Sequence, residues 1–334
     1  MTTYVKKNLK IILILIAGVI YVSQNPYFLF VSTLASINAV AVLGLNLISG
    51  YTGQLHLGQA AFMGIGAYTS ATLCVKVGFS FWFALPIAIL FSATASTLLG
   101  IPALKLRGGP YLALVTQTFG ELVYVIILNW VAVTGGPFGC SGIKPPSIGS
   151  FQLLDLKYYF FFVLSFLILA YWLMNRIIKS KFGRVFLAIK ESEDAAQSIG
   201  INTMKYKILA FVIAGAFGGI AGTLYAPFIG FISPEQFTWM PSLFLISMAI
   251  VGGLDSLPGG ILGAFILTFL PEVLRVADQY RLIIYGVLLV LTLTFLPNGL
   301  ISLWGLSPRE INSIFNKRFK ELLHKKDRLF AKQL

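Results

Sequence analysis

Polar side chains interrupt a long apolar run in residues 43–68, which read LGLNLISGYTGQLHLGQAAFMGIGAY. Asn46, Gln54, His56 and Gln59 place amide and imidazole groups at or near membrane depth. Non-helical backbone at that depth must be buried in protein or line a water-filled cavity. These four residues are therefore candidates for a translocation pathway. The alternative is that the glycines of this segment permit close helix packing and the polar groups cap helix ends at the inner interface.

A carboxylate lies near the middle of another apolar run, at Glu121. An ionisable group there must be paired, protonated or facing water, so Glu121 is a fifth candidate pathway residue. Gln117, one helical turn earlier, is a possible companion. A role in gating and a structural bond between helices both remain open. Glu121 is nearly alone among intramembrane acids, which argues against a proton-coupled mechanism.

The same residue types exclude several other functions. The two histidines, His56 and His324, form no cluster with metal-ligand spacing, so no metal or other cofactor is expected. The sequence contains no Gly-Lys pair and hence no phosphate-binding loop of the G-x-x-x-x-G-K-[ST] type. No paired carboxylates or nucleophile motif suggest an enzyme. We expect Cys74 and Cys140 to be free thiols.

The elements that must position these residues are transmembrane helices. The chain is 57% hydrophobic and 11% charged, whereas soluble domains carry about 25% charged residues. Reading about 20 apolar residues per crossing predicts an all-α, polytopic integral membrane protein with about ten helices. Span 59–77 is also compatible with a re-entrant segment, and 240–253 is short. The ten expected spans are approximately residues 9–24, 27–48, 59–77, 81–101, 111–133, 158–176, 208–232, 240–253, 260–275 and 281–304.

The charges show which side faces the cytoplasm. The net charge is +13, and 20 of the 25 lysines and arginines fall on one side of this topology. That distribution matches the positive-inside rule, so both termini and all the basic loops are expected in the cytoplasm. The protein is accordingly placed in the inner or plasma membrane, and nucleic acid is not expected as a partner. Residues 307–334 form a basic amphipathic tail that suits the lipid surface of the inner leaflet, with a partner-binding helix as the alternative.

One cytoplasmic loop is too patterned to be a simple connector. Residues 183–200 read GRVFLAIKESEDAAQSIG, a charged and helix-forming stretch between two apolar spans. An apolar side is expected from Phe186, Ile189, Ala195, Ala196 and Ile199. A short helix displayed on a membrane face is an element that a partner protein can grip and push. A second feature, VGGLDSLPGGILGAF at 251–265, predicts either a tight turn or a broken helix near the cytoplasmic mouth.

The segments 43–68, 183–200 and 251–265, in this order and spacing, resemble the M-type (LivM-like) permease subunits of branched-chain amino acid ABC importers. The resemblance covers roughly residues 35–305. It implies a permease domain over 1–306, with a coupling segment at about 179–207 whose helix docks on an ATP-binding subunit. ABC importers often carry Glu-Ala-Ala, three residues, then Gly. Here Asp194-Ala195-Ala196 precedes Gly200 at that spacing, Asp replaces Glu, and the usual downstream Leu-Pro is absent.

The resemblance also implies a mechanism and partners. The candidate coupling residues are Arg184, Glu191, Asp194, Ala195, Ala196 and Gly200. The expected partners are two ABC ATPase subunits, a companion permease in a heterodimer and an extracytoplasmic substrate-binding protein, so the chain itself is non-catalytic. The implied cargo is a branched-chain or other hydrophobic amino acid. Urea or short amides on the same machinery, and a self-sufficient secondary transporter, remain alternatives.

Overall fold

A computed structural model describes residues 25–104, 109–148 and 151–273, together with several positions between 283 and 303. The expected span 9–24, most of span 281–304 and the tail 307–334 lie outside the described residues. The α-helices are α2 (Pro26–Asn46), α3 (Gln59–Thr72), α4 (Phe81–Ala103), α5 (Gly109–Asn129), α6 (Val131–Thr134), α7 (Leu156–Lys179), α8 (Lys181–Glu191), α9 (Glu193–Ser198), α10 (Thr203–Ile229), α11 (Trp239–Gly252) and α12 (Leu257–Val273).

Short elements complete the described fold. Two π-helical turns extend α2 and α3, namely η1 (Leu47–Tyr51) and η2 (Leu73–Val77). Three 3₁₀ turns are η3 (Gly136–Phe138), η4 (Pro234–Phe237) and η6 (Leu300–Leu303). The strands are β1 (Cys140–Ser141), β2 (Ser147–Ile148), β3 (Phe151–Gln152) and β4 (Phe231–Ile232). β1 pairs antiparallel with β4, and β2 with β3.

Six helices of the described part are long and apolar enough to cross a bilayer, and they coincide with six of the expected spans. They are Pro26–Tyr51, Gln59–Val77, Phe81–Ala103, Tyr111–Asn129, Leu156–Lys179 and Thr203–Ile229. The 14 residues of α11 extend only about 21 Å, less than the hydrocarbon core of about 30 Å. The chain is therefore a multi-pass membrane protein. The number of ten spans stays a prediction.

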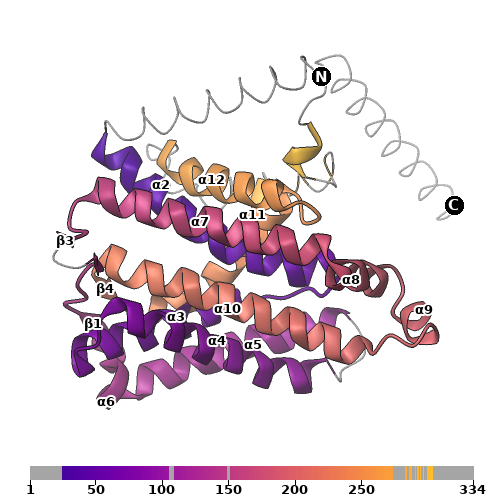
Figure 1. Cartoon of the computed structure of the whole chain (residues 1–334), viewed down its shortest axis with the longest axis horizontal. Helices are drawn as coiled ribbons and strands as arrows, with labels where there is room; N and C mark the ends of the chain where they lie inside the picture. Colours follow the sequence, from indigo (N-terminus) through magenta and orange to yellow (C-terminus); the bar gives the residue numbers. More distant parts are fainter. Residues whose placement is uncertain are drawn as a thin grey trace, which may run out of the picture.

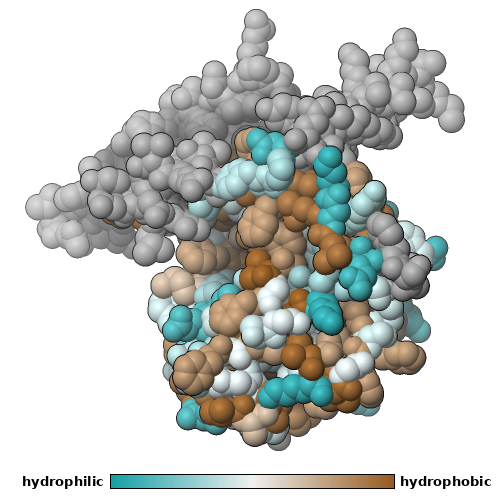
Figure 2. Space-filling model, turned by 90° about the vertical axis from the view of Figure 1, so that its left-hand side faces the viewer, coloured by the Kyte–Doolittle hydropathy of each residue, from teal (hydrophilic) through white to brown (hydrophobic). Residues whose placement is uncertain are grey.

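The long helices lie side by side and have two distinct ends (Figure 1). Helices α8 and α9 project at one end, and the four short strands lie at the other. Figure 2 views the strand end, where hydrophilic and hydrophobic residues are interspersed. Because the loops at both ends are polar and the helices between them are apolar, the bundle axis lies across the membrane.

Helix α10 occupies the core and packs against α3, α4 and α2 (Figure 1). Small residues allow this close approach, as is usual between membrane helices. A Cβ atom on Gly222 of α10 would lie 1.9 Å from the Met63 carbonyl oxygen of α3. Serines of α4 add bonds: Ser92 Oγ donates to the Gly215 carbonyl at 2.7 Å, and Ser96 Oγ to that of Phe211 at 2.5 Å. Where lipid offers no polar partner, such bonds fix one arrangement of α4 against α10.

Side-chain caps explain where several helices begin. Asn25 Oδ1 accepts from the Tyr27 amide at the start of α2, and Asp155 Oδ1 accepts from the Lys157 amide at the start of α7. Asn202 Oδ1 accepts from the Lys205 amide at the start of α10. Each cap satisfies one of the amides that a helix leaves without an internal partner. The sequence around these asparagine and aspartate residues thus sets the helix starts locally.

Candidate functional site

The chain between η1 and α3 is non-helical and enters the bundle. The Gln54 amide donates to the Ile48 carbonyl at 3.0 Å, and the Leu57 amide donates to Thr116 Oγ1 of α5 at 3.0 Å. Gln59, the first residue of α3, lies level with Ala214, near the middle of α10, because its Nε2 donates to the Ala214 carbonyl at 3.2 Å. Helix α3 therefore begins inside the bundle. Within residues 52–58, Thr52, His56 and Gly58 are buried, whereas Gly53 and Leu55 are exposed. The non-helical backbone is thus buried in protein where it approaches α3, as expected for such backbone at membrane depth.

Three of the four predicted polar residues in this segment are completely buried. Asn46, His56 and Gln59 are each 0% exposed, whereas Gln54 is half-buried. Gln59 Nε2 also donates to the Ala41 carbonyl of α2 at 3.1 Å, so this side chain joins α2, α3 and α10. Gln59 thus holds three helices together, and Asn46 contacts the turn between α11 and α12. Both bonds differ from the helix-end capping considered as the alternative role of these residues.

His56 is enclosed by aromatic rings. Its imidazole stacks on Phe62 at a centroid distance of 5.4 Å and meets the edge of Phe211 at 5.5 Å. Neither ring nitrogen has a hydrogen-bond partner among the described residues, and the same holds for Asn46 Oδ1 and Gln59 Oε1. A buried polar atom without a hydrogen-bond partner costs free energy, so several such atoms in one place call for an explanation such as a functional role.

Glu121 forms a specific hydrogen bond at mid-depth in the bundle. Its Oε1 accepts from the Trp239 amide at 3.1 Å, and Trp239 is the first residue of α11. A carboxylate at a helix N-terminus satisfies a free amide and interacts favourably with the helix dipole. Gln117, the expected companion, makes no hydrogen bond with Glu121 in the described structure. The side chain of Glu121 is only half-buried, so part of it lies on the surface of this chain.

The starts of α3 and α11 meet at this depth. The Ala60 amide in the first turn of α3 donates to Ser242 Oγ in the first turn of α11 at 3.0 Å. Helix α3 runs from this point toward the strand end, while α11 runs toward the end that carries α8 and α9 (Figure 1). Two helices thus begin at mid-depth, which is the broken-helix arrangement found at the binding sites of many transporters.

A cavity of about 330 Å³ lies beside these helix starts, between α2, α3, α10, α11 and α12. Its lining is mainly apolar and includes Leu34, Tyr225, Phe244 and Leu267. Asn38 and Thr268, which share a hydrogen bond of 3.2 Å, are polar groups in the wall. None of the five predicted pathway residues lines this cavity. The cavity was not foreseen because its lining comes from these five helices and from η4, which are six separate segments with ordinary sequences.

The predicted coupling segment forms two helices rather than one. Ser192 breaks the stretch, since its backbone is extended (φ −159°, ψ 112°) and its hydroxyl accepts from the Ala195 amide to cap α9. Ser180 caps α8 in the same way, accepting from the Phe182 amide at 3.1 Å. Residues 183–200, expected to form a short helix, are therefore divided between two helices, because the Ser192 side chain competes for the backbone amides.

Most of the predicted coupling residues are exposed, but one is not. Arg184, Glu191, Asp194, Ala195 and Gly200 are exposed, and Gly200 has the left-handed conformation (φ +84°) of a turn after a helix. Ala196 is 2% exposed, so it packs inward and offers no surface to a partner.

The apolar side expected for this element is also smaller than predicted. Phe186 and Ile189 are buried, whereas Ile199 is 75% exposed and Ala195 also faces outward. The break at Ser192 changes the helical phase, which explains why Ala195 and Ile199 leave the apolar side. Exposed apolar groups of α8, Phe182 and Leu187, lie on the outside of the same element.

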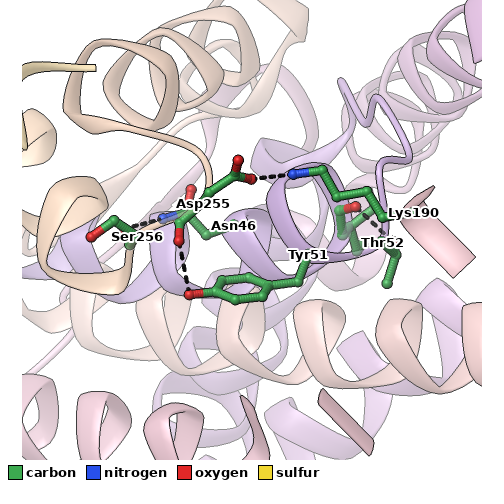
Figure 3. A network of polar contacts seen from close by, with 7 residues as sticks. Asn46, Tyr51, Thr52, Lys190, Asp255 and Ser256 are labelled. Atoms are coloured by element: carbon green, nitrogen blue, oxygen red, sulfur yellow. Dashed lines mark hydrogen bonds and ion pairs between the residues drawn. The ribbon is translucent and has the colours of Figure 1, made fainter. Parts of the chain in front are cut away.

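Ionic contacts tie this element to the bundle. Glu193 forms an ion pair with Lys207 of α10, whose side chain is 8% exposed, and Glu193 Oε1 accepts from Thr203 Oγ1 at 3.0 Å. Lys190 of α8 forms an ion pair with Asp255 in the turn between α11 and α12 (Figure 3). Sequence reasoning missed both pairs, although Asp255 is the only acidic residue between Glu235 and Glu272.

The turn at Asp255 is itself well anchored (Figure 3). Tyr51 Oη donates to the Asp255 carbonyl at 3.1 Å, and Asn46 Nδ2 donates to the Ser256 carbonyl at 3.2 Å. The prediction of a tight turn between two helices is confirmed, because α11 ends at Gly252 and α12 begins at Leu257.

Known proteins share this sequence over most of its length. The profile of the family described as branched-chain amino acid transport system / permease component matches residues 27–293. The high-affinity branched-chain amino acid transport system permease protein LivM of Escherichia coli K12 is 38% identical over 294 residues, covering 81% of this chain and 69% of that protein.

More distant relatives include both permease types of such systems. A probable LivM of Methanocaldococcus jannaschii is 29% identical, with 60% of this chain and 62% of that protein covered. The LivH permease of Escherichia coli K12 is 25% identical, with 80% and 92% covered. No solved structure matches the chain. The match over residues 27–293 and the 38% identity to LivM show that this chain belongs to the branched-chain amino acid transport permease family.

Proposed function

We propose that this chain is one transmembrane permease subunit of an ABC importer that carries branched-chain amino acids across the cytoplasmic membrane. Relatives named as LivM and LivH permeases support both the cargo and a companion permease of the second type. The remaining partners in the proposal are two ATPase subunits and an extracytoplasmic binding protein. ATP hydrolysis resides in the ATPase subunits, so the permease chain alone is non-catalytic.

The main support for placing ATP hydrolysis in separate subunits is the exposed α8–α9 element. It projects from one end of the bundle (Figure 1) and combines apolar Phe182 and Leu187 with exposed charges at Arg184, Glu191 and Asp194. Such a mixed, protruding surface suits contact with a soluble protein. We assign the docking of an ATPase subunit to this face, with Ala195 and Gly200 at its edge and Ala196 as a packing residue behind it.

Glu121 supports the location of the pathway. A partly exposed carboxylate at mid-depth does not face lipid, because that placement costs several kcal/mol. We infer that the companion permease covers the α5–α11 surface and that a water-lined route passes Glu121 between the two subunits. Asn46, Gln54, His56 and Gln59 lie behind this surface, where they support the helix starts. The buried polar atoms of Asn46, His56 and Gln59 that lack hydrogen-bond partners among the described residues face the interior.

Reconstitution tests the proposal. Proteoliposomes that contain this permease, its companion, the ATPases and the binding protein should accumulate labelled leucine only with ATP. The isolated chain should neither hydrolyse ATP nor take up leucine. Uptake by this chain alone under an ion gradient would refute the proposal in favour of a secondary transporter. A binding protein that retains urea or short amides instead would change the cargo.

Orientation is tested separately. The α8–α9 end carries most of the basic residues near the described helix ends, so the proposal places it, and both termini, in the cytoplasm. A single cysteine at Ile199, in a variant without Cys74 and Cys140, should resist an impermeant maleimide applied to intact cells. Labelling from outside would reverse the topology and with it the assignment of the ATPase face.

A further inference from the structure

The last turn of α8 contacts two irregular segments at once. The Lys190 ammonium pairs with the carboxylate of Asp255, in the turn after α11 (Figure 3). The stem of the same side chain lies over Gly53, in the segment before α3. A Cβ atom at Gly53 would be 3.2 Å from Lys190 Cγ, and the φ angle of Gly53 is +68°. Glycine at position 53 therefore permits both this turn and this contact.

Each of these segments adjoins one of the two helices, α3 and α11, that begin at mid-depth. Residues 52–58 precede α3, and the turn 253–256 follows α11. The starts of these two helices are joined by the bond from Ala60 to Ser242, and Glu121 caps α11 there. A helix of 14 residues such as α11 moves as a nearly rigid body, so displacement of its cytoplasmic end shifts Trp239 relative to Glu121.

The turn also has other anchors, which determine what the ion pair adds. Tyr51 and Asn46 hold the backbone of Asp255 and Ser256 to the end of α2 and η1. Among the described residues, the Asp255 side chain contacts α8 through Lys190. Removing the pair leaves the turn attached to α2 but separates it from α8.

We propose that the Lys190–Asp255 ion pair transmits motion of the α8–α9 element to α11, and through α11 to the helix starts beside Glu121. The inference rests on the proposed function, since it requires an ATPase subunit to move α8. Lys190 and Asp255 are positioning residues in this scheme, because neither contacts the pathway. The pair couples two states of the bundle. Its loss therefore lowers the amount of substrate transported per ATP hydrolysed and leaves assembly with the ATPase subunits unchanged.

The exposure of the pair makes this distinction measurable. The side chain of Lys190 is 32% exposed and that of Asp255 is 68% exposed. Solvent-exposed ion pairs contribute little to stability, so variants that break this one should insert and fold normally. A purely structural role would instead appear as a lower melting temperature.

Charge reversal and its rescue test the proposal in the complete reconstituted transporter. We expect Lys190→Asp and Asp255→Lys each to reduce leucine uptake per ATP hydrolysed by about five- to tenfold, within the usual range of coupling between sites. The double variant with both changes should recover most of this loss. Lys157→Asp, at an exposed lysine at the start of α7 and at the opposite end of the bundle, is the matched control and should leave uptake unchanged.

The outcomes separate this inference from the proposed function. Single variants that transport like the wild type, or a double variant that recovers nothing, overturn the role of the pair while the permease assignment stands. Single variants that lose the ATPase subunits on copurification also overturn it, because Lys190 would then be a docking residue. A wild-type chain that fails to transport with its partners refutes the proposed function itself.

Discussion

Replacing Glu121 distinguishes a helix cap from a pathway residue. The carboxylate accepts one bond from the Trp239 amide, and its exposed part faces the α5–α11 surface. Glu121→Gln retains an oxygen that can accept this bond but removes the charge. Glu121→Ala removes both the acceptor and the charge. Comparing the two variants therefore separates the contribution of the bond from that of the charge.

The effects on stability follow from the geometry. Loss of the charge at the N-terminus of α11 should cost about 0.3–1 kcal/mol in the glutamine variant. Loss of the bond in the alanine variant should cost about 1–3 kcal/mol, toward the lower end because the group is half-buried. If Glu121 lines the pathway, uptake should fall in both variants by about tenfold or more, equivalent to about 1.4 kcal/mol in the transport barrier.

The assay combines thermal unfolding of the detergent-solubilised complex with initial leucine uptake per complex in proteoliposomes. Glu235→Gln, at an exposed glutamate in η4, is the matched control and should change neither quantity. If the glutamine variant unfolds like the wild type and also transports like it, Glu121 acts as a cap alone. The placement of the pathway on the α5–α11 surface would then be refuted.

Three further predictions concern the α8–α9 element and the strand end. Ser192→Ala removes the hydroxyl that caps α9 and should cost about 1 kcal/mol locally, seen as faster hydrogen exchange across α9 with α8 unchanged. Glu193→Gln keeps an acceptor oxygen but leaves the nearly buried Lys207 ammonium without a neutralising charge, and it should lower the free energy of unfolding by about 1–3 kcal/mol. Glu191→Gln at an exposed site should not, and equal melting temperatures for the two variants would contradict this prediction. Burial raises the pKa of the Cys140 thiol, and the nearby Lys76 opposes this effect. Maleimide should therefore react with Cys140 slowly at neutral pH, faster as the pH rises and fastest after unfolding. Rapid labelling of Cys140 in the native protein at neutral pH would contradict its burial.

The class of the protein and the depth of its polar segments follow from the sequence because hydropathy is a local property. Each run of about 20 apolar residues must cross the bilayer wherever its neighbours lie. The six described spans accordingly coincide with expected ones. The exposure of Arg184, Glu191 and Asp194 was likewise predictable, since three charges in a loop between two spans have little apolar protein in which to be buried.

Pattern alone was less successful where several local preferences compete. Residues 183–200 have the composition of one helix, yet Ser192 caps a second helix and changes the phase of the residues that follow. Ala195 and Ile199 become exposed as a result, whereas Ala196 is buried as expected for the apolar side. A serine in a helical stretch was the available signal, but whether it caps or continues a helix depends on the packing of the segments around it.

The sequence by itself determined that this is a polytopic membrane protein with a buried polar segment, an intramembrane carboxylate and a displayed charged loop. Only the tertiary structure decided what those groups contact. Glu121 meets Trp239 across 118 positions of sequence, and Lys190 meets Asp255 across 65. Contacts of this kind depend on how α3, α5, α8 and α11 pack, a collective outcome of close approach between many side chains that no local pattern of residues encodes.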